Sequence, residues 1–248
     1  MIFDGTETII GRGAQAEVFL YKGFAYKVYK ASYPAEWIAF ERKQQEQVNK
    51  AGLCPVRYYD TGDSHIIKMD FIDGDTLENI IRKYVREQLP EAMAKIAEGY
   101  KLLSHAFQFV HSAGIQGLAI PHLRDTAAMG LSDEDSGKIL PTIERLSGKM
   151  KECICHLDMH FLNIMLLRGK ELGLDSDYRI IDWMNARIAP PVFDYARTYV
   201  IFDEFSKEAL ELYKSFVMPD LKSSGVSDSD FADAVTVCSI IRKHEKGE

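Results

Sequence analysis

The chain has 248 residues, of which 46% are hydrophobic and 11% are aromatic, a composition that excludes a disordered protein. Its net charge of −7 argues against broad binding to nucleic acid or to an anionic membrane, whereas a cationic small molecule would suit it. No apolar run approaches the ~20 residues of a membrane span, and residues 1–5 lack the basic stretch and apolar core of a signal peptide.

The first third of the chain is typical of a sheet interrupted by one helix. Strands are predicted for runs rich in β-branched and aromatic residues, at 7–10, 17–21, 24–29 and 65–71. A helix is predicted to open at Pro34 and to end near Gly52. The pattern changes near Asp73-Gly74, so we expect two lobes, 1–72 and 73–248.

The rest of the chain is predicted to be mostly helical. Asp75 is expected to cap a first helix, with Glu78 completing a capping box. Residues 114–136 hold several glycines and little periodicity, which indicates a long loop or an insertion. Further helices are predicted at 90–112, 139–150, 207–217 and 228–243, and short strands near 163–166 and 178–181.

The cysteines are too sparse for a disulfide framework, and they fit a reducing cytoplasm. Cys153 and Cys155 directly precede His156, a spacing that also suggests zinc. We favour the simpler interpretation that the two thiols are small side chains on a buried strand.

Two glycines, Gly11 and Gly13, separate the first two predicted strands in the pattern G-x-G-x-x-A-x-V. Backbone amides of such a loop can cover phosphates, because glycine lets the chain approach closely. Taken alone, an ordinary hairpin with two glycines is the more common explanation, and the G-K-[ST] ending of a Walker loop is missing.

Lys27 lies on the next predicted strand, where period-two alternation points it to the same side as Ala25. A small residue leaves room for a nucleotide base, while lysine can reach phosphates. Glu41, on the predicted helix, could pair with Lys27, although Glu36 and Glu46 could compete for that role.

The run from His156 to Asn163 is the strongest chemical signal. Asp158 and Asn163 lie five residues apart, so one loop can present a base and a metal ligand, and Asp182 follows a short apolar strand. Phosphoryl transfer needs such positioning together with charge neutralisation by magnesium. The rival interpretation takes His156, Asp158 and His160 as ligands in a zinc or iron hydrolase. We disfavour it because the other histidines are scattered singly, as surface or packing residues.

In this order, the motifs resemble the aminoglycoside phosphotransferase and choline kinase family, the small-molecule branch of the protein-kinase-like fold. They span residues 11 to 197, and the last three are the specific ones. The matching pieces are G-x-G-x-x-A-x-V at 11–18, A-x-K at 25–27, Glu41, H-x-D-x-H-x-x-N at 156–163, Ile-Ile-Asp-Trp at 180–183 and Asp194-Tyr-Ala-Arg197.

The resemblance implies an α+β, bilobal fold with a small antiparallel-sheet N-lobe, carrying one helix, and a larger, mostly helical C-lobe. The N-lobe, 1–72, would bind nucleotide, and the C-lobe, 73–248, would hold the catalytic and substrate-binding groups. It also implies transfer of the γ-phosphoryl group of ATP or GTP to a hydroxyl of a small molecule.

Residue roles follow from the same resemblance. Asp158 would be the catalytic base, or would orient the acceptor hydroxyl, and Asn163 and Asp182 would hold Mg²⁺. Lys27, oriented by Glu41, would contact the α- and β-phosphates. The glycine loop and Ala25 would cover the nucleotide, and a hinge at 69–72, including Asp70 and Ile72, would offer backbone groups to the base. His156 would anchor the catalytic loop, and Asp194 would brace it.

The departures from protein kinases favour a small acceptor. Trp183-Met184 follows Asp182, His160 lies two residues after Asp158, and only eleven residues separate Asp182 from Asp194, which leaves little room for an activation loop. A pseudokinase or an atypical protein kinase that binds nucleotide remains the alternative. Aromatic and acidic residues could bind an amino or quaternary ammonium group, or could be core and surface residues: Trp183, Tyr195, Tyr199, Asp203 and Glu204.

Overall fold

The computed structural model describes residues 3–173 and 177–247. The chain divides into two compact units, Met1–Asp73 and Gly74–Glu248, called unit 1 and unit 2 below. Among the described residues, no helix combines the length and the apolar composition needed to cross a lipid bilayer.

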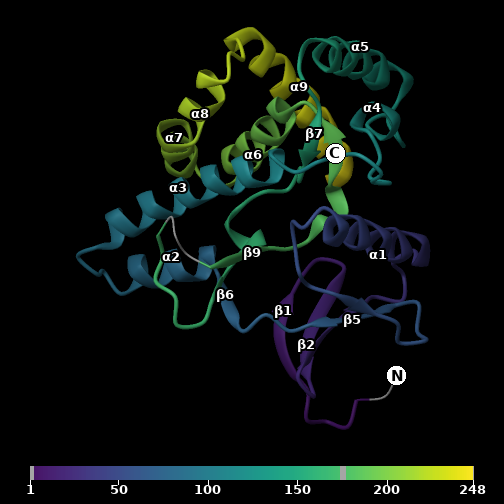
Figure 1. Ribbon diagram of the computed structural model, residues 1–248, viewed down its shortest axis with the longest axis vertical. Coiled ribbons are helices and arrows are strands. Elements are labelled where there is room, and N and C mark those ends of the chain that lie inside the picture. The colour runs from purple at the N-terminus through teal and green to yellow at the C-terminus, as the bar shows by residue number, and fades with distance from the viewer. Residues whose placement is uncertain (1–2, 174–176, 248) are drawn as a thin grey trace. The chain divides into compact units, whose positions relative to one another are not determined.

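Unit 1 is a sheet with one long helix (Figure 1). Its elements, within the described residues, are β1 (Thr8–Arg12), β2 (Ala16–Tyr21), β3 (Phe24–Tyr29), α1 (Ala35–Lys50), β4 (Tyr58–Tyr59) and β5 (Ile66–Asp70). Every strand pair is antiparallel, and the spatial order is β1-β2-β3-β5-β4.

Residues on the sheet of unit 1 form two apolar clusters. One cluster joins Ala16, Tyr29 and Ile67 of the sheet to Ile38 of α1. The other is aromatic and includes Tyr21 and Tyr26, with Phe3 packed against both rings. Because side chains two apart on a strand share a face, Lys27 lies on the same face of β3 as Tyr29.

The described part of unit 2 is mostly helical, with two small sheets. Its strands are β6 (Gly74–Thr76), β7 (Cys153–Cys155), β8 (Ile164–Leu167), β9 (Tyr178–Ile180) and β10 (Arg187–Ala189). Its helices are α2 (Leu77–Arg86), α3 (Ala92–His111), α4 (Leu123–Thr126), α5 (Asp133–Lys149), α6 (Pro191–Phe205), α7 (Lys207–Phe216), α8 (Met218–Ser223) and α9 (Asp228–Lys246). Short 3₁₀ turns lie at Phe161–Asn163 and Trp183–Asn185.

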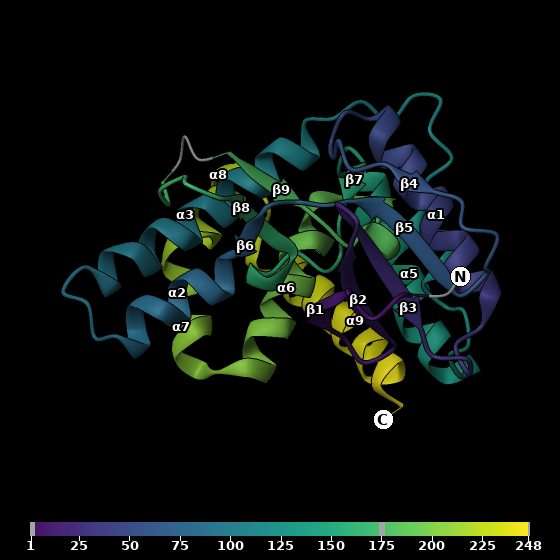
Figure 2. The same ribbon diagram turned by 90° about the horizontal axis from the view of Figure 1, so that it is seen from below.

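The strands of unit 2 pair as β6-β8-β9 and as β10-β7, all antiparallel. Figure 2 shows α2 beside α3, and these two helices also pack together in the structure. The helical core gathers fully buried side chains such as Leu103 and Phe107 of α3, Ile143 of α5, and Phe193 of α6. β7 packs against α3 and α6, and β8 packs against α2. These helices therefore support the loops that follow the two small sheets.

The sequence prediction differs from the structure at several points in unit 2, and it does not include β6, β10 or α8. Thr76, and not Asp75, caps α2, because the Thr76 hydroxyl accepts a hydrogen bond from Asn79 N. Residues 114–136 are not one loop, since they include α4 and the first turn of α5. Helix α6 was not predicted; it is buried on most sides and therefore lacks an amphipathic period.

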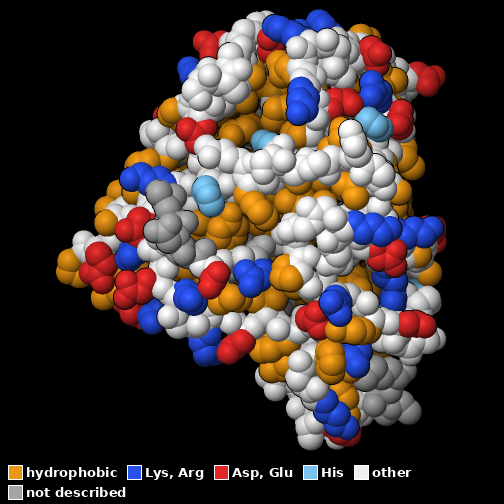
Figure 3. All heavy atoms as spheres, in the orientation of Figure 1, with side chains coloured by type: hydrophobic (Ala, Val, Ile, Leu, Met, Phe, Trp, Pro, Cys, Tyr) orange, Lys and Arg blue, Asp and Glu red, His pale blue; other side chains and the backbone are white. Residues whose placement is uncertain are grey.

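The acidic side chains that give the chain its negative charge are spread over the face shown in Figure 3. On the face of unit 2 shown in Figure 3, acidic and basic side chains are interspersed with hydrophobic ones. Several of the charged side chains pair within one helix, as Lys138 does with Glu134.

Candidate active site

The loop that follows β7 is held by a carboxylate from α6. Asp194 is fully buried and accepts hydrogen bonds from the backbone N–H of His156 at 3.0 Å and of Leu157 at 2.8 Å. Leu157 has φ of 57°, a left-handed conformation that costs a non-glycine residue roughly 1–2 kcal/mol. Hydrogen bonds to a charged acceptor, about 1.5–3 kcal/mol each, offset this cost. Asp194 thus sets the backbone path into Asp158, the brace that the resemblance implies.

His156 ties the same loop to the end of β9. Burial lowers the pKa of His156, so its ring is neutral near pH 7, and Nε2 donates a hydrogen bond to Ile181 O at 3.0 Å. The ring packs on Trp183, with the centroids 4.6 Å apart, and Trp183 Nε1 donates to Ile180 O at 2.9 Å. These contacts fix the backbone on the N-terminal side of Asp182.

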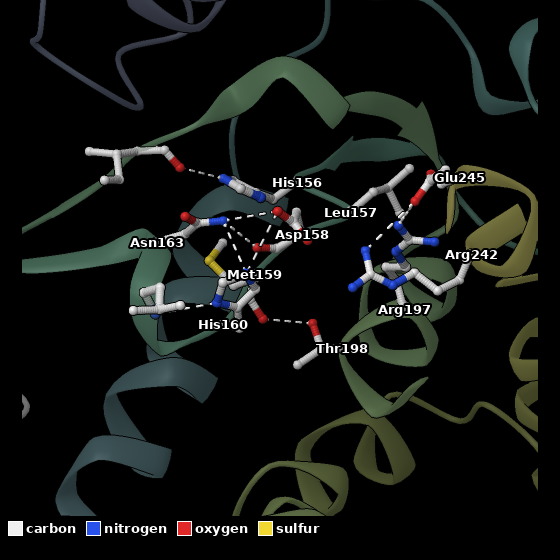
Figure 4. A network of polar contacts seen from close by, with 12 residues as sticks. His156, Leu157, Asp158, Met159, His160, Asn163, Arg197, Thr198, Arg242 and Glu245 are labelled. Atoms are coloured by element: carbon white, nitrogen blue, oxygen red, sulfur yellow. Dashed lines mark hydrogen bonds and ion pairs between the residues drawn. The ribbon is translucent and has the colours of Figure 1, made fainter. Parts of the chain in front are cut away.

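Asp158, His160 and Asn163 converge at the centre of the loop (Figure 4). Asn163 Nδ2 donates to the backbone oxygen of Asp158 at 2.8 Å and to its Oδ2 at 3.1 Å. His160 Nδ1 accepts from Leu162 N at 3.3 Å, so the ring proton lies on Nε2, which is 3.6 Å from Asp158 Oδ2. The loop therefore closes on itself around one carboxylate.

The Asp158 carboxyl is ionised over the whole physiological pH range. Burial acts to raise its pKa, but the contact with the His160 ring and the charge of Arg197 lower the pKa to about 2. The side chain keeps 21% of its surface exposed, so a ligand can reach it.

Asn163 and Asp182 lie at the same end of the β8-β9 hairpin. The hairpin pairs Ile164 with Ile180, so the residue before β8 faces the residues that follow β9, and Ile181 N donates to Asn163 O at 3.0 Å. Asp182 has φ of 62°, a left-handed conformation of the kind that gathers at functional sites. Because Asn163 directs its amide nitrogen to Asp158, its side-chain oxygen is the atom left for a cation. An amide and a carboxylate oxygen suit Mg²⁺.

Unit 1 pairs Lys27 with Glu41. Lys27 Nζ lies 2.9 Å from Glu41 Oε1, and Glu41 is buried at 2% exposure. Glu41 also accepts hydrogen bonds from Tyr29 OH and, at 3.4 Å, from Tyr58 OH. The two competitors that the sequence left open, Glu36 and Glu46, are both exposed. The ammonium group of Lys27 is thus held by a carboxylate that cannot itself move freely.

Gly11 and Gly13 are not required by the fold of unit 1. Neither has a positive φ, and a Cβ would meet only Val18 Cβ at 3.5 Å or Ala16 O at 3.4 Å, respectively. Gly13 N donates to Ala16 O at 2.8 Å and closes the tight turn between β1 and β2. Side chains at these two positions would fit the fold, but they would obstruct a ligand that approaches the loop from solvent.

The remaining candidates of unit 1 lie on β3 and at the end of β5. Ala25 is buried at 5% exposure, and Ile72 is half-buried. The Asp70 carboxylate accepts from Tyr59 OH at 2.8 Å and from Arg57 N at 2.9 Å, which ties β5 to the segment around β4.

Of the two interpretations of the aromatic and acidic residues, the structure supports the core interpretation for Trp183 and Tyr195. Trp183 and Tyr195 are buried at 1% and 5% exposure, so they are core residues whose ring faces are covered. Glu204 pairs with Arg242 at 3.2 Å, and Lys214 lies over the ring of Tyr199.

Two supporting residues were missed by sequence reasoning. Thr198 Oγ1 donates to Met159 O at 2.8 Å, and it could have been found because it lies one turn after Asp194 on α6. The sequence pattern indicates only a surface or packing role for His111, but its Nε2 lies 2.9 Å from Asp194 Oδ2. No local pattern could reveal a contact between residues 83 positions apart.

Solved structures with similar folds include two aminoglycoside phosphotransferases and a choline kinase. Aminoglycoside phosphotransferase APH(4)-Ia gives a TM-score of 0.62 at 12% identity, over 98% of this chain and 88% of that one. An aminoglycoside-3'-phosphotransferase of type VIII gives 0.61 at 15% identity, over 94% and 93%. Choline kinase LicA from Streptococcus pneumoniae gives 0.57 at 16% identity, over 96% and 84%. At these identities the likeness shows a shared, protein-kinase-like fold.

The sequence itself carries the family assignment. None of the curated proteins compared with the chain matches it significantly. The profile of the phosphotransferase enzyme family, by contrast, matches residues 6–217, well over half of the chain. This match includes the glycine loop, Lys27, Glu41 and the whole catalytic loop. The chain is therefore a member of the phosphotransferase enzyme family, and it has a kinase-like fold.

Proposed function

We propose that the protein is a kinase that transfers the γ-phosphoryl group of ATP or GTP to a hydroxyl group of a small molecule. The observation that carries this proposal is the closed loop in which an ionised Asp158 is hydrogen-bonded to Asn163 and tied, through Ile181 and His156, to the backbone before Asp182. Neighbouring structures include a GDP complex of an aminoglycoside 2'-phosphotransferase and an AMP complex of LicA.

Asp158 acts on the acceptor hydroxyl. A carboxylate with a pKa of about 2 is a weak base, so it cannot remove the hydroxyl proton before transfer begins. It instead accepts a hydrogen bond from the hydroxyl, aims its oxygen, and takes the proton as the new bond forms. A loose transition state needs only this much help from a base.

Asn163 and Asp182 supply the oxygen ligands for Mg²⁺, which when bound neutralises charge on the phosphate oxygens. Lys27 contacts the α- and β-phosphates, and Glu41 holds its ammonium group in place. The loop containing Gly11 and Gly13 covers the phosphates with backbone amides. We assign nucleotide binding to residues 1–72 and catalysis and acceptor binding to residues 73–248.

The adenine or guanine base is assigned to the end of β5. Ala25 leaves space on β3, while the backbone at Ile72, which follows β5, offers hydrogen-bonding groups. The backbone N–H of Asp70 already donates to Arg57 O at 3.1 Å. The Asp70 side chain is already engaged with Tyr59 and Arg57, so its contribution is to fix this backbone. The four cysteines, all within the described residues, form no disulfide, which fits a cytoplasmic protein.

The test is nucleotide consumption with Mg-ATP and with Mg-GTP over a panel of aminoglycosides, amino alcohols, amino sugars and sugars. We expect acceptor-dependent turnover that falls at least about a hundredfold in Asp158→Asn. The matched control is Asp228→Asn, whose carboxylate is 89% exposed and lies in the first turn of α9. It should leave turnover unchanged.

Two other outcomes would each revise the proposal. Mg-dependent nucleotide binding without turnover for any acceptor would favour a pseudokinase. Phosphorylation of a protein without small-molecule turnover would favour an atypical protein kinase. Folded protein that binds neither nucleotide would remove the proposal entirely.

A further inference from the structure

Three soft metal-ligating side chains meet where α3 ends beside β7. Cys153 and Cys155 lie two apart on β7 and therefore share a face of that strand. His111 is the last residue of α3, which packs against β7. One ring nitrogen of His111 and the two sulfur atoms all lie within 4.8 Å of one another. The zinc interpretation of the sequence paired the two thiols with His156. In the structure, the histidine that lies beside both sulfur atoms is His111.

The separation of the sulfur atoms matches a metal site. Cys153 Sγ and Cys155 Sγ are 3.9 Å apart. Two thiolates bound to tetrahedral zinc at about 2.3 Å lie about 3.8 Å apart, so both could bind one ion with almost no movement. A disulfide requires about 2.05 Å, and the two residues are free thiols.

The imidazole is already held in one orientation. His111 Nε2 contacts Asp194 Oδ2 at 2.9 Å, and the ring packs against Phe107 and Tyr195. A carboxylate partner of this kind is usual for histidines that bind metals, because it fixes the ring. The His111 side chain keeps 13% of its surface exposed, whereas Cys155 is fully buried, so an ion would enter from the histidine side.

We propose that His111, Cys153 and Cys155 form a binding site for a thiophilic metal ion, Zn²⁺ or its analogues Cd²⁺ and Co²⁺, with water as the fourth ligand. Without the ion, both thiols donate to Ala189 O, and Cys155 also to Pro190 O, at 3.4–3.6 Å. Binding replaces two S–H bonds by two metal–sulfur bonds and releases two protons to solvent. Two thiolates and a divalent cation sum to zero charge, which keeps the cost of burial small.

The site is separate from the proposed magnesium site and has a different preference. Mg²⁺ takes oxygen ligands in an octahedron, so it will not compete for two thiolates and an imidazole. The inference depends on the side chains around β7 and not on any assignment of acceptor or nucleotide. If the proposed kinase activity were not found, the metal-site proposal would still stand. If no metal bound, the proposed kinase activity would likewise still stand.

The test uses the full chain without a polyhistidine tag, stripped of metal and kept in excess Mg²⁺. Addition of Co²⁺ or Cd²⁺ should produce a thiolate-to-metal charge-transfer band that saturates at one ion per chain. About two protons per ion should be released at a pH below the thiol pKa values. Absence of the band with the unmutated, folded protein would overturn the proposal.

Variants then locate the site. Cys153→Ala and Cys155→Ala should each weaken binding by more than about a hundredfold. The matched controls Cys54→Ala and Cys238→Ala remove equally buried thiols elsewhere and should leave the band unchanged. Asp182→Ala should also leave it unchanged. A band of full intensity in both Cys153→Ala and Cys155→Ala would place the thiolates elsewhere and overturn the proposal.

Discussion

Asp194 Oδ1 accepts a hydrogen bond from the backbone N–H of Leu157 at 2.8 Å, across 37 positions of sequence. The same carboxylate binds His156 N and contacts His111 Nε2. A helix that sequence periodicity did not reveal therefore determines the conformation of the loop that carries the proposed catalytic carboxylate.

Asp194→Asn should lower both stability and turnover. An amide offers one acceptor oxygen in place of two, so one backbone N–H of the loop would face an NH₂ group. We expect a loss of about 1–3 kcal/mol in the free energy of unfolding and at least a tenfold loss of kcat, measured by urea denaturation and initial rates. Glu134→Gln, a mostly exposed carboxylate on α5, is the control. Unchanged kcat in a folded Asp194→Asn variant would contradict the brace.

The contribution of Asp158 to stability should disappear only in strong acid. Its pKa is about 2 in the folded chain and 3.8 as an ordinary value, so its ionised form stabilises the fold by on the order of 2 kcal/mol above pH 4. That contribution is lost as pH falls from about 4 to 2. Unfolding of wild type and Asp158→Asn from pH 7 to pH 2 measures it. A difference between them that already shrinks between pH 7 and pH 5 would contradict the prediction.

Comparing Lys27→Met with a double variant should separate the role of Lys27 in nucleotide binding from its role in stability. The variant leaves Glu41 buried with only its tyrosine contacts, which should cost about 1–3 kcal/mol and weaken nucleotide binding. The double variant Lys27→Met with Glu41→Gln should regain part of the stability and none of the binding. Lys43→Met, on the exposed side of α1, is the control. Recovery of nucleotide affinity in the double variant would refute a direct role for Lys27.

Gly74→Ala and Gly137→Ala should have opposite effects. A Cβ at Gly74 would lie 2.1 Å from the backbone oxygen of Leu166, so β6 would have to separate from β8. We expect destabilisation of at least about 2 kcal/mol. Gly137 lies within α5 with open space around its Cβ position, and alanine there should stabilise by roughly 0.5–1 kcal/mol. Thermal unfolding of both variants gives the comparison, and equal melting temperatures would contradict it.

Local patterns in the sequence predicted much of this structure. β3 spans Phe24–Tyr29 as predicted, and the strands on either side of the catalytic loop and α7 lie where expected. The grouping of Asp158 with Asn163 follows from their spacing within one loop. The order of motifs along the chain identified the family and the kinase-like fold before any contact was known.

The misses have physical causes. α6 is apolar on most sides, so it gives no amphipathic signal, and its burial is decided by partners far along the chain. The start of α5 carries a sequence signal, because serine is a favoured N-cap residue and Ser132 Oγ accepts a hydrogen bond from Asp135 N. The glycines around it mask this signal. The contact of His111 with Asp194 depends on tertiary packing alone.

The profile of the family ends at residue 217, yet the fold of unit 2 does not. Helix α9 packs along α6, buries Ala234 and Val237, and pairs Glu245 with Arg197, while Cys238 donates to Phe193 O (Figures 1 and 2). A chain cut at residue 217 would uncover the side of α6, the helix that carries Asp194, on which α9 packs. The part of the chain that the family profile matches is therefore smaller than the part that packs around α6.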